Sequence, residues 1–383
     1  MQILQEEKKY AFLAIDKARK LGPKRVILEL KKSLLRGRGG AGFPTGLKWE
    51  ATFCDKADIK YVVCNAHEGE PQTLKDEFIL ENFSHLVLSG IIIAAQTIGA
   101  KKAFIVLNSS YKNAHQLLKK EIKNFSRKGK LYGLKIEIVL AQSFYIGGEE
   151  SSLLNEIEKK RVEPRQKPPF VCNIGLYGAP TIVNNVETFS NIPFIISEGH
   201  NAYKKIGSKN SPGKKIVTIS GNVKNPGVYE IELGMKLKDV IALAGADFPD
   251  IKFVLTGGYS GTIVLPNKLN ISFDFDSLAQ GVALGAGTIV VYNKKTDSRK
   301  CLREWLSFFA QESCGQCTPC REGLTRAYEI VSKKGRLNSE DEKKLLELFD
   351  ALKESSFCPL GSGAPTASEK LLQAFRKELI VGK

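Results

Sequence analysis

The sequence lacks two features that would place the protein outside the cytoplasm or within a membrane. Residues 1–9 contain no apolar stretch followed by a small-residue cleavage site, so we expect no secretory signal. The longest apolar run, residues 86–100, is interrupted by residues that include Ser89, Gly90, Gln96 and Thr97, and it is too short to span a bilayer. We therefore expect a buried helix there, no direct membrane insertion, and a cytoplasmic protein that is peripheral to a membrane only through its complex.

The sequence also lacks a concentrated basic arm, although its formal net charge is +16. The lysines are spread along the expected helices, for example at Lys8, Lys119 and Lys159, so most of them should lie on solvated faces. A nucleic-acid surface is therefore not expected. The excess positive charge would instead suit an acidic protein partner or an anionic cofactor. With 383 residues, the chain is long enough for two or three domains.

Four of the eight cysteines form a pattern typical of an iron–sulfur site. Cys314, Cys317 and Cys320 recur every third residue on one short loop, and Cys358 precedes Pro359 downstream. The three clustered thiols can point at a common centre, and the remote fourth completes the coordination. Zinc, which usually takes two separated Cys-x2-Cys pairs, and unligated structural thiols remain alternatives. The single cysteines are expected to be small buried residues without disulfides: Cys54, Cys64, Cys172 and Cys301.

A glycine-rich stretch, residues 36–49, contains a formal G-x-G-x-x-G at Gly37, Gly39 and Gly42. A dinucleotide fingerprint of this kind must follow a strand, whereas the pattern here predicts a preceding helix, so we do not interpret it as a Rossmann site. Dense glycine still lets the backbone approach a ligand closely. Three basic side chains beside the glycines could suit phosphates: Arg36, Arg38 and Lys48. The alternative is that the stretch is a flexible surface loop.

Strands and helices alternate in the first half of the chain. Strands are predicted at residues 60–65, 103–108 and 135–140, and helices at residues 6–20, 26–34, 84–98 and 114–128. This alternation indicates an α/β layer with a largely parallel sheet. A polar loop at residues 65–71 follows the first strand, where ligand contacts are usual in such sheets. The alternative for Glu68 and Glu70 is a pair of solvated turn carboxylates.

Three further segments offer polar groups near helix starts. Gly147 and Gly148 precede a predicted helix and can present free N–H groups to an anion, although Glu149 and Glu150 could be ordinary first-turn acids. Residues 163–170 form an extended segment, and residues 181–188 place two asparagines before another helix. We expect an α/β domain at residues 1–210, a compact β-rich unit at 211–297, and a helical domain at 298–383 built from helices at 302–311, 323–332, 339–353 and 368–378.

Several long motifs, in the same order along the chain, resemble the family of 51-kDa flavoprotein subunits of respiratory complex I. That family includes the diaphorase subunits of NAD-linked hydrogenases and formate dehydrogenases. The matching segments are residues 35–49, 145–150, 167–170, 183–188 and 312–323. The resemblance extends over nearly the whole chain, and motifs that match in register are more specific than any single one. Residues 361–365 look closer to the hydrogenase and formate dehydrogenase branch.

The resemblance implies an FMN- and NADH-binding α/β domain, a β-grasp-like soluble-ligand-binding domain, and a four-helix domain that holds one [4Fe-4S] cluster. It implies an FMN site formed by Gly37, Gly40, Lys48, Asn65, His67, Glu68, Tyr145, Gly148, Glu149, Asn184 and Asn185. It implies NADH contacts at Phe43, Glu70, Glu150, Lys167 and Phe170, and cluster ligation by Cys314, Cys317, Cys320 and Cys358. No side chain is expected to act as a general acid or base.

The chain departs from the family pattern at three positions. His67 stands where relatives usually have Asp, which removes or reverses a charge beside the flavin. Gly147 replaces a common Cys, a change that looks harmless. Ala51 stands where relatives often supply an adenine-stacking aromatic ring, a role that Phe53 could take.

The function implied by the resemblance is hydride transfer between NADH and FMN, in either direction, followed by single-electron transfer through the cluster to another subunit. The partner would be a thioredoxin-like [2Fe-2S] protein, a hydrogenase, a formate dehydrogenase or a complex I module. An alternative is a scaffold paralogue that keeps the cluster fold without binding NADH. A zinc-stabilised nucleic-acid binder is a third hypothesis, which predicts strongly salt-dependent binding.

Overall fold

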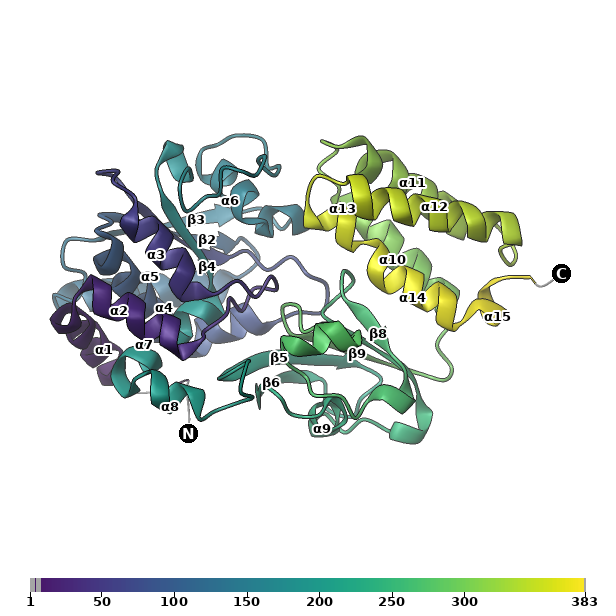
Figure 1. The fold of residues 1–383 in the computed structure, drawn as a ribbon, viewed down its shortest axis with the longest axis horizontal. Coiled ribbons are helices and arrows are strands. Elements are labelled where there is room, and N and C mark those ends of the chain that lie inside the picture. Colours follow the sequence, from purple (N-terminus) through teal and green to yellow (C-terminus); the bar gives the residue numbers. More distant parts are fainter. Residues whose placement is uncertain (1–3, 5–7, 382–383) are drawn as a thin grey trace.

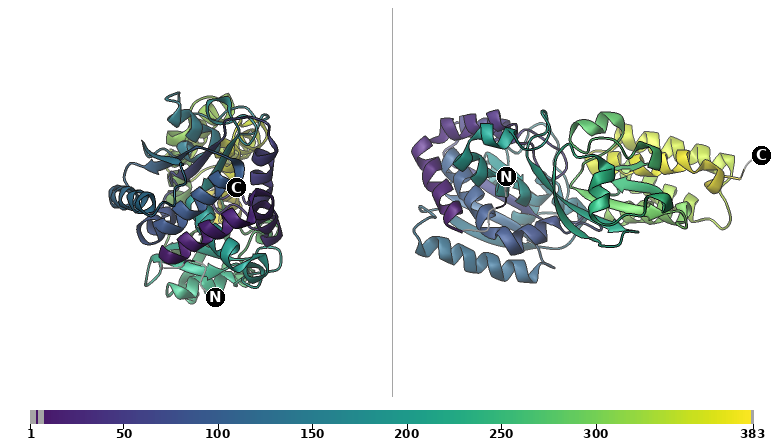
Figure 2. Two further views of the ribbon diagram at one scale, coloured as in Figure 1. Left: turned by 90° about the vertical axis from the view of Figure 1, so that its left-hand side faces the viewer. Right: turned by 90° about the horizontal axis from the view of Figure 1, so that it is seen from below.

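The computed structural model describes residue 4 and residues 8–381. An α/β layer lies at one end of an elongated molecule, and a second sheet and the C-terminal helices lie at the other (Figures 1 and 2). The helix expected at residues 6–20 is α1 (Lys8–Leu21), and residues 6 and 7 lie outside the described residues.

The first sheet has four strands in the order β3-β2-β1-β4, and all of its pairings are parallel. The nearly continuous apolar runs of its strands explain the burial on both faces: Val62 and Cys64 pack against the helices of the main core, whereas Val63 packs with α6. The elements of this part are α2 (Pro23–Ser33), α3 (Thr45–Cys54), β1 (Tyr61–Ala66), α4 (Lys75–Ile98), β2 (Lys102–Asn108), α5 (Lys112–Arg127), β3 (Lys135–Ala141), α6 (Glu150–Ile157), β4 (Thr181–Asn185), α7 (Val186–Glu198) and α8 (His200–Lys204).

Helix α4 is the central helix of this layer and begins nine residues earlier than the sequence predicts. Its backbone leaves helical geometry at Phe83 (φ −133°), so the helix has a kink directly before residue 84, where the sequence predicts the helix to begin. By length and composition it could cross a membrane, but 78% of its apolar window is buried within the fold. It crosses α7 at Gly90, where an added Cβ would collide with the carbonyl oxygen of Phe189. The predicted buried helix is therefore present, in longer form.

The second sheet has five strands in the order β6-β5-β9-β7-β8, with β5 and β9 parallel and the other pairs antiparallel. Helix α9 packs on one face, and the other face shares a hydrophobic core with the C-terminal helices. The predicted α/β class with a second, β-grasp-like sheet is confirmed. Its elements are β5 (Lys214–Gly221), β6 (Gly227–Glu232), α9 (Leu237–Leu243), β7 (Ile251–Thr256), β8 (Thr262–Val264) and β9 (Thr288–Asn293).

The C-terminal part is helical, as expected (Figure 1). The Asp297 side chain caps α10 by accepting from the N–H groups of Arg299 and Lys300, and Asn338 with Asp341 forms a capping box on α12. The last predicted helix, residues 368–378, is divided between α14 and α15, and the short helix α13 before it was not predicted. The elements are α10 (Ser298–Glu312), α11 (Thr318–Ser332), α12 (Ser339–Ser355), α13 (Pro359–Gly363), α14 (Pro365–Ala374) and α15 (Arg376–Leu379). The domain boundaries at 210 and 297 remain predictions.

Candidate functional site

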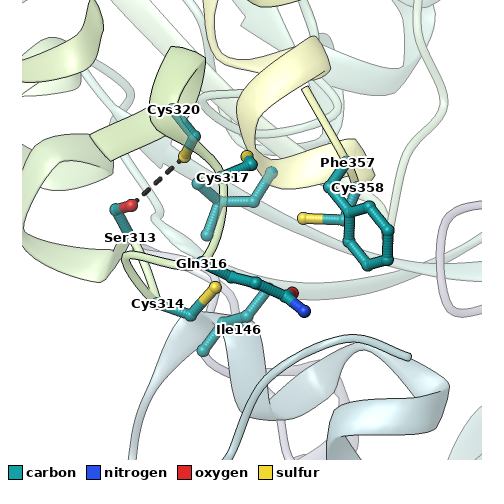
Figure 3. A pocket seen from close by; sticks show the side chains of 9 residues that line it. Ile146, Ser313, Cys314, Gln316, Cys317, Cys320, Phe357 and Cys358 are labelled. Carbon is teal, nitrogen blue, oxygen red and sulfur yellow. Dashed lines mark hydrogen bonds between the residues drawn. The ribbon is translucent and has the colours of Figure 1, made fainter. Parts of the chain in front are cut away.

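Four thiols line one cavity between the C-terminal helices and the first domain (Figure 3). Cys314 lies on the loop after α10, Cys317 and Cys358 are the residues that precede α11 and α13, and Cys320 lies in the first turn of α11. Both helix starts are held by proline near the first position. The cavity is completed by Ile146, Ser313, Gln316, Phe357 and Leu360.

The chemistry of this cavity fits a metal cluster with several thiolate ligands. Burial raises the pKa of Cys320 to about 12 and also raises the pKa of Cys358, so these thiols need a strong positive partner to ionise. Among the residues that the structure describes, no three His, Cys, Asp or Glu side chains converge closely enough for one metal ion. The thiols surround the cavity from different sides (Figure 3), as a cluster of several irons requires.

A short 3₁₀ segment, Tyr145–Gly148, connects this cavity to the loops at the carboxyl ends of β1 and β3. Ile146 lines the thiol cavity, and the backbone N–H of Tyr145 donates to Glu312 Oε2 at 2.7 Å. At the other end of the segment, the Gly148 carbonyl accepts from Asn65 Nδ2 at 2.8 Å. The predicted flavin loops and the thiol cavity are therefore adjacent.

A charged group brings together residues from three separate predicted motifs. Lys48 Nζ lies 3.0 Å from Glu150 Oε2, and Lys167 Nζ lies 2.8 Å from Glu149 Oε1 and 3.0 Å from Glu150 Oε1. Burial alone would raise the pKa of Glu150, but Lys48 and Lys167 outweigh it and lower that pKa. Glu149 also caps α6 by accepting from the N–H groups of Ser151 and Ser152. Glu149 is therefore the N-cap residue of α6, and Glu150 is the acid in its first turn, beside the contacts of both with Lys167.

The asparagines at the end of β4 belong to a second, buried network. Trp49 Nε1 donates to Asn184 Oδ1 at 2.8 Å, and Asn185 Nδ2 donates to Asp76 Oδ2 at 2.7 Å. Lys75 Nζ lies 2.6 Å from Asp76 and 3.3 Å from Glu68. Burial and then the neighbouring Asp76 raise the pKa of Glu68, and Lys75 opposes both effects.

Sequence reasoning missed Lys75 and Asp76, whose only signal is a pair of opposite charges at the start of an apolar helix. The alternative that Glu68 is a solvated turn carboxylate is wrong, because its side chain is 4% exposed and bound within this network.

Glu70 is also largely enclosed. Its Oε1 accepts from the backbone N–H of Tyr259 at 2.8 Å, on the loop after β7. Burial raises the pKa of Glu70 to about 7, although the hydrogen bonds from Tyr259 and Tyr145 act in the opposite direction. The solvated-turn alternative is wrong here as well.

The glycine-rich loop follows helix α2, as predicted, and α3 follows it. Two of the three basic residues assigned to phosphates are used to hold the loop. Arg36 Nε donates to the Gly42 carbonyl at 2.8 Å, and its guanidinium lies 4.5 Å from the centre of the Phe275 ring. Arg38 is 1% exposed and donates to Tyr203 and Pro212. Lys48 alone faces the predicted cofactor residues, and its helix α3 was not predicted.

A buried ion pair fastens the second sheet onto the first domain, and sequence reasoning missed it. Lys215 on β5 bonds to Glu187 on α7 through atoms 2.5 Å apart, and both side chains are at most 2% exposed. Lys215 also donates to the Ala286 carbonyl at 2.8 Å. The turn at Gly285 and Ala286 lies 3.9 Å from the position of a Cβ on Gly40, so the second sheet supports the glycine-rich loop.

The remaining predicted residues are placed as follows. Phe43 and Phe170 are exposed, at 53% and 54%, and Gly37 N–H donates to the Phe43 carbonyl. Phe53 packs partly buried against the main core, and its suggested role against adenine stays a prediction. Two of the four single cysteines are not buried, contrary to expectation: Cys54 is exposed and Cys172 is half-buried.

His67 and Gly147 touch each other, although the sequence treats them as separate departures. His67 is 5% exposed, and its Nε2 donates to the Gln142 carbonyl at 2.5 Å. An ideal Cβ on Gly147 would lie 2.7 Å from His67 Cε1. A side chain larger than hydrogen at position 147 therefore requires movement of the His67 ring or the backbone.

Three family descriptions match segments of this chain. Residues 30–194 match the Nuo51 FMN-binding domain, residues 216–246 match the SLBB domain, and residues 300–381 match the NADH-ubiquinone oxidoreductase-F iron-sulfur binding region. The last segment contains the four thiols of the cavity.

Full-length relatives show the same similarity. The chain is 37% identical over 374 residues to an F-type subunit of the NADH-quinone oxidoreductase of Rhizobium meliloti, covering 94% of this chain and 88% of that protein. It is 37% identical over 370 residues to HndC, a subunit of the NADP-reducing hydrogenase of Solidesulfovibrio fructosivorans, covering 93% and 75%. A solved chain of an NAD+-reducing [NiFe]-hydrogenase has a TM-score of 0.89 at 31% identity, covering 96% of this chain. This chain spans 64% of the length of that hydrogenase chain.

Proposed function

Because the chain belongs to the family of F-type subunits of NADH-quinone oxidoreductase, we propose that it oxidises NADH, or reduces NAD, as the flavoprotein component of a redox complex. The matches to FMN-binding and iron–sulfur-binding families confirm the prediction of FMN, NAD(H) and a [4Fe-4S] cluster. Bound FMN would accept hydride from NADH, and the cluster would pass electrons on singly.

The observation that carries this proposal is the Tyr145–Gly148 segment, which touches the thiol cavity through Ile146 and the predicted flavin loops through Gly148. A continuous short segment keeps both centres at a fixed separation. Tyr145 is further held by rings on α10, with centroids 5.3 Å away at Phe308 and 6.1 Å away at Phe309. The chain itself thus supplies a rigid connection between the two cofactors.

The site residues are proposed to divide into two sets. Gly37, Gly40, Lys48, Asn65, His67, Glu68, Tyr145, Gly148, Glu149, Asn184 and Asn185 would surround FMN, and Phe43, Glu70, Glu150, Lys167 and Phe170 would contact NADH. The ion pairs among Lys48, Lys167 and Glu150 support the adjacency of the two sets, because Lys48 of the FMN set bonds to Glu150 of the NADH set. Cys314, Cys317, Cys320 and Cys358 would hold the cluster.

The partner is proposed to be an acidic iron–sulfur protein that docks beside the thiol cavity. Phe357 lines the cavity and is 42% exposed, and two exposed arginines, one after α6 and one in α11, bond to the adjoining cysteine loop. Arg161 donates to the Cys314 carbonyl, and Arg321 donates to the Gly315 carbonyl. Such a partner also suits the net charge of +16 and a cytoplasmic location.

The test is anaerobic purification and reconstitution, followed by measurement of bound FMN and of the loss of flavin absorbance on addition of NADH. Stoichiometric FMN that is bleached by NADH is the expected result. A protein that takes up iron and sulfide but no flavin would support the scaffold alternative and overturn this proposal. Zinc without iron would support the zinc alternative.

A further inference from the structure

The strongest unassigned feature of the flavin side is the contact between a buried imidazole and a glycine on the neighbouring loop. We propose that His67 and Gly147 form a size-matched pair that positions the two flavin loops, with the His67 ring filling the space of a side chain at position 147. This inference rests on the proposed FMN site and assigns a positioning role to the pair.

The need for glycine at position 147 is one of space and not of backbone conformation. Gly147 is not among the glycines with positive φ. A Cβ built on it would lie 2.7, 2.9 and 3.4 Å from Cε1, Nε2 and Nδ1 of His67, and no atom of another residue is nearer. The His67 ring is therefore what excludes a side chain at position 147.

The ring has little freedom to move aside. His67 is 5% exposed, and its Nε2 is 2.5 Å from the Gln142 carbonyl oxygen at the end of β3. Because a carbonyl oxygen only accepts, Nε2 carries the proton. The His67 backbone N–H donates to Asn65 Oδ1 at 3.1 Å, and Asn65 Nδ2 donates to the Gly148 carbonyl at 2.8 Å. The His67 ring thus joins the end of β1 to Gln142, and the His67 backbone joins it to Gly148 through the Asn65 side chain.

A second observation points from this pair toward a ligand. In the neutral imidazole with its proton on Nε2, Nδ1 of His67 is an acceptor, and it is buried without a hydrogen-bond partner among the residues that the structure describes. Buried polar atoms are normally paired, so the ring retains an acceptor for a hydroxyl donor. Bound FMN carries hydroxyl groups of this kind, and Asn65 and Gly148 on either side are proposed FMN residues.

The test is a double-variant cycle on the apoprotein, with the dissociation constant of FMN measured by flavin fluorescence. Gly147→Ala should weaken FMN binding by about tenfold or more, because it overpacks a filled site. His67→Ala should weaken it by about fivefold, and in that background Gly147→Ala should change it by less than about twofold. His67→Phe keeps a ring at least as large as imidazole at this position, so Gly147→Ala should remain harmful there. Gly227→Ala on β6 has open space around its Cβ and serves as the matched control.

The bound flavin provides a readout that a purely structural defect would not shift. The midpoint potential and visible spectrum of FMN should change in Gly147→Ala and return toward the His67→Ala values in the double variant. Equal effects of Gly147→Ala in the parent and His67→Ala backgrounds would overturn the proposal. If Gly147→Ala fails to fold, recovery of folding in the double variant supports the pair, and failure of both overturns it.

Failure of the proposed function gives a different result. A parent protein that binds no FMN after reconstitution would contradict the flavin role. The pair is then tested by the free energies of unfolding of the parent, the two single variants and the double variant. Additive effects of the two substitutions would overturn the proposal, and strong coupling between them would support it.

Discussion

The thiol cavity and the flavin side of the molecule are assembled in different ways. The cavity takes three of its four thiols from one loop and helix start, residues 314–320, so its ligands are close in sequence. On the flavin side, Lys48 meets Glu150 across 102 residues and Trp49 meets Asn184 across 135. The first site depends on local spacing, whereas the second depends on strand order and on the packing of the second sheet against the first domain.

The largest expected effect tests the local site. Cys358→Ser should abolish assembly of the cluster, because the fourth thiolate comes from a separate helix start and no fifth thiol of the described residues lines the cavity. FMN binding should persist, since the flavin side has its own contacts. Iron and labile sulfide analysis, with the spectrum of the reduced protein, measures the change. Cys172→Ser, outside the cavity, is the control and should retain a full cluster. A fully loaded Cys358→Ser protein would contradict the ligand assignment.

The next effect tests the dispersed site through its support. Lys215→Met leaves the buried Glu187 carboxylate without its cationic partner and should lower the free energy of unfolding by about 3–5 kcal/mol. It should also weaken FMN binding, because the second sheet supports the glycine-rich loop. Urea unfolding and flavin titration measure both quantities.

Lys214→Met is the matched control, since Lys214 pairs with Glu230 at a more exposed position and should cost less than about 1 kcal/mol. In the double variant Lys215→Met with Glu187→Gln, part of the loss should return because no unpaired charge remains. A Lys215→Met protein as stable as the Lys214→Met control would show that the pair does not fasten the two parts.

This contrast explains how much the sequence alone could predict. Cys314, Cys317 and Cys320 identify the cavity, because their spacing is itself the geometry. The three predicted parallel strands are found within one residue at each end, since continuous β-branched runs in an α/β pattern leave few alternatives. Strand β4 escaped notice because it has five residues and ends in two asparagines, which are typical of turns.

The features that escaped prediction are those whose cause lies far away in the chain. Arg38 looks like a phosphate ligand beside glycines, but Tyr203 and Pro212 bury it. Lys215 looks like a surface lysine, and only the docking of β5 against α7 encloses it. The contact of His67 with Gly147 likewise follows from the parallel register of β1 and β2 and of β2 and β3, which no local pattern contains.

A smaller effect concerns Glu70, where the flavin side meets the second sheet. Burial raises the pKa of Glu70 from its ordinary 4.5 to about 7, so folding favours the neutral carboxyl. Its contribution to stability is full below about pH 4.5, falls as the pH rises toward 7, and stays lost above that. Glu70→Gln, which stays neutral, should therefore be more stable than the parent at pH 8 by about 1–2 kcal/mol, with little difference near pH 4.5.

The measurement is the difference in urea midpoint between parent and Glu70→Gln across this pH range. Glu347→Gln, at an exposed carboxylate, is the control and should show no such pH-dependent difference. A Glu70→Gln curve parallel to the parent curve would show that Glu70 titrates as an ordinary exposed acid.

The smallest effect separates binding from turnover within the dispersed site. Lys167 lies between Glu149 and Glu150 and is about one third exposed, so its removal should leave the fold intact. Lys167→Met should raise KM for NADH about three- to tenfold with kcat nearly unchanged, because it removes an interaction that substrate and transition state share. Lys160→Met is the control and should leave both constants unchanged, because the exposed Lys160 pairs with a buried carboxylate, Glu158, that Arg165 continues to hold. A fall in kcat at constant KM would instead place Lys167 beside the transferred hydride and join it to the flavin set of residues.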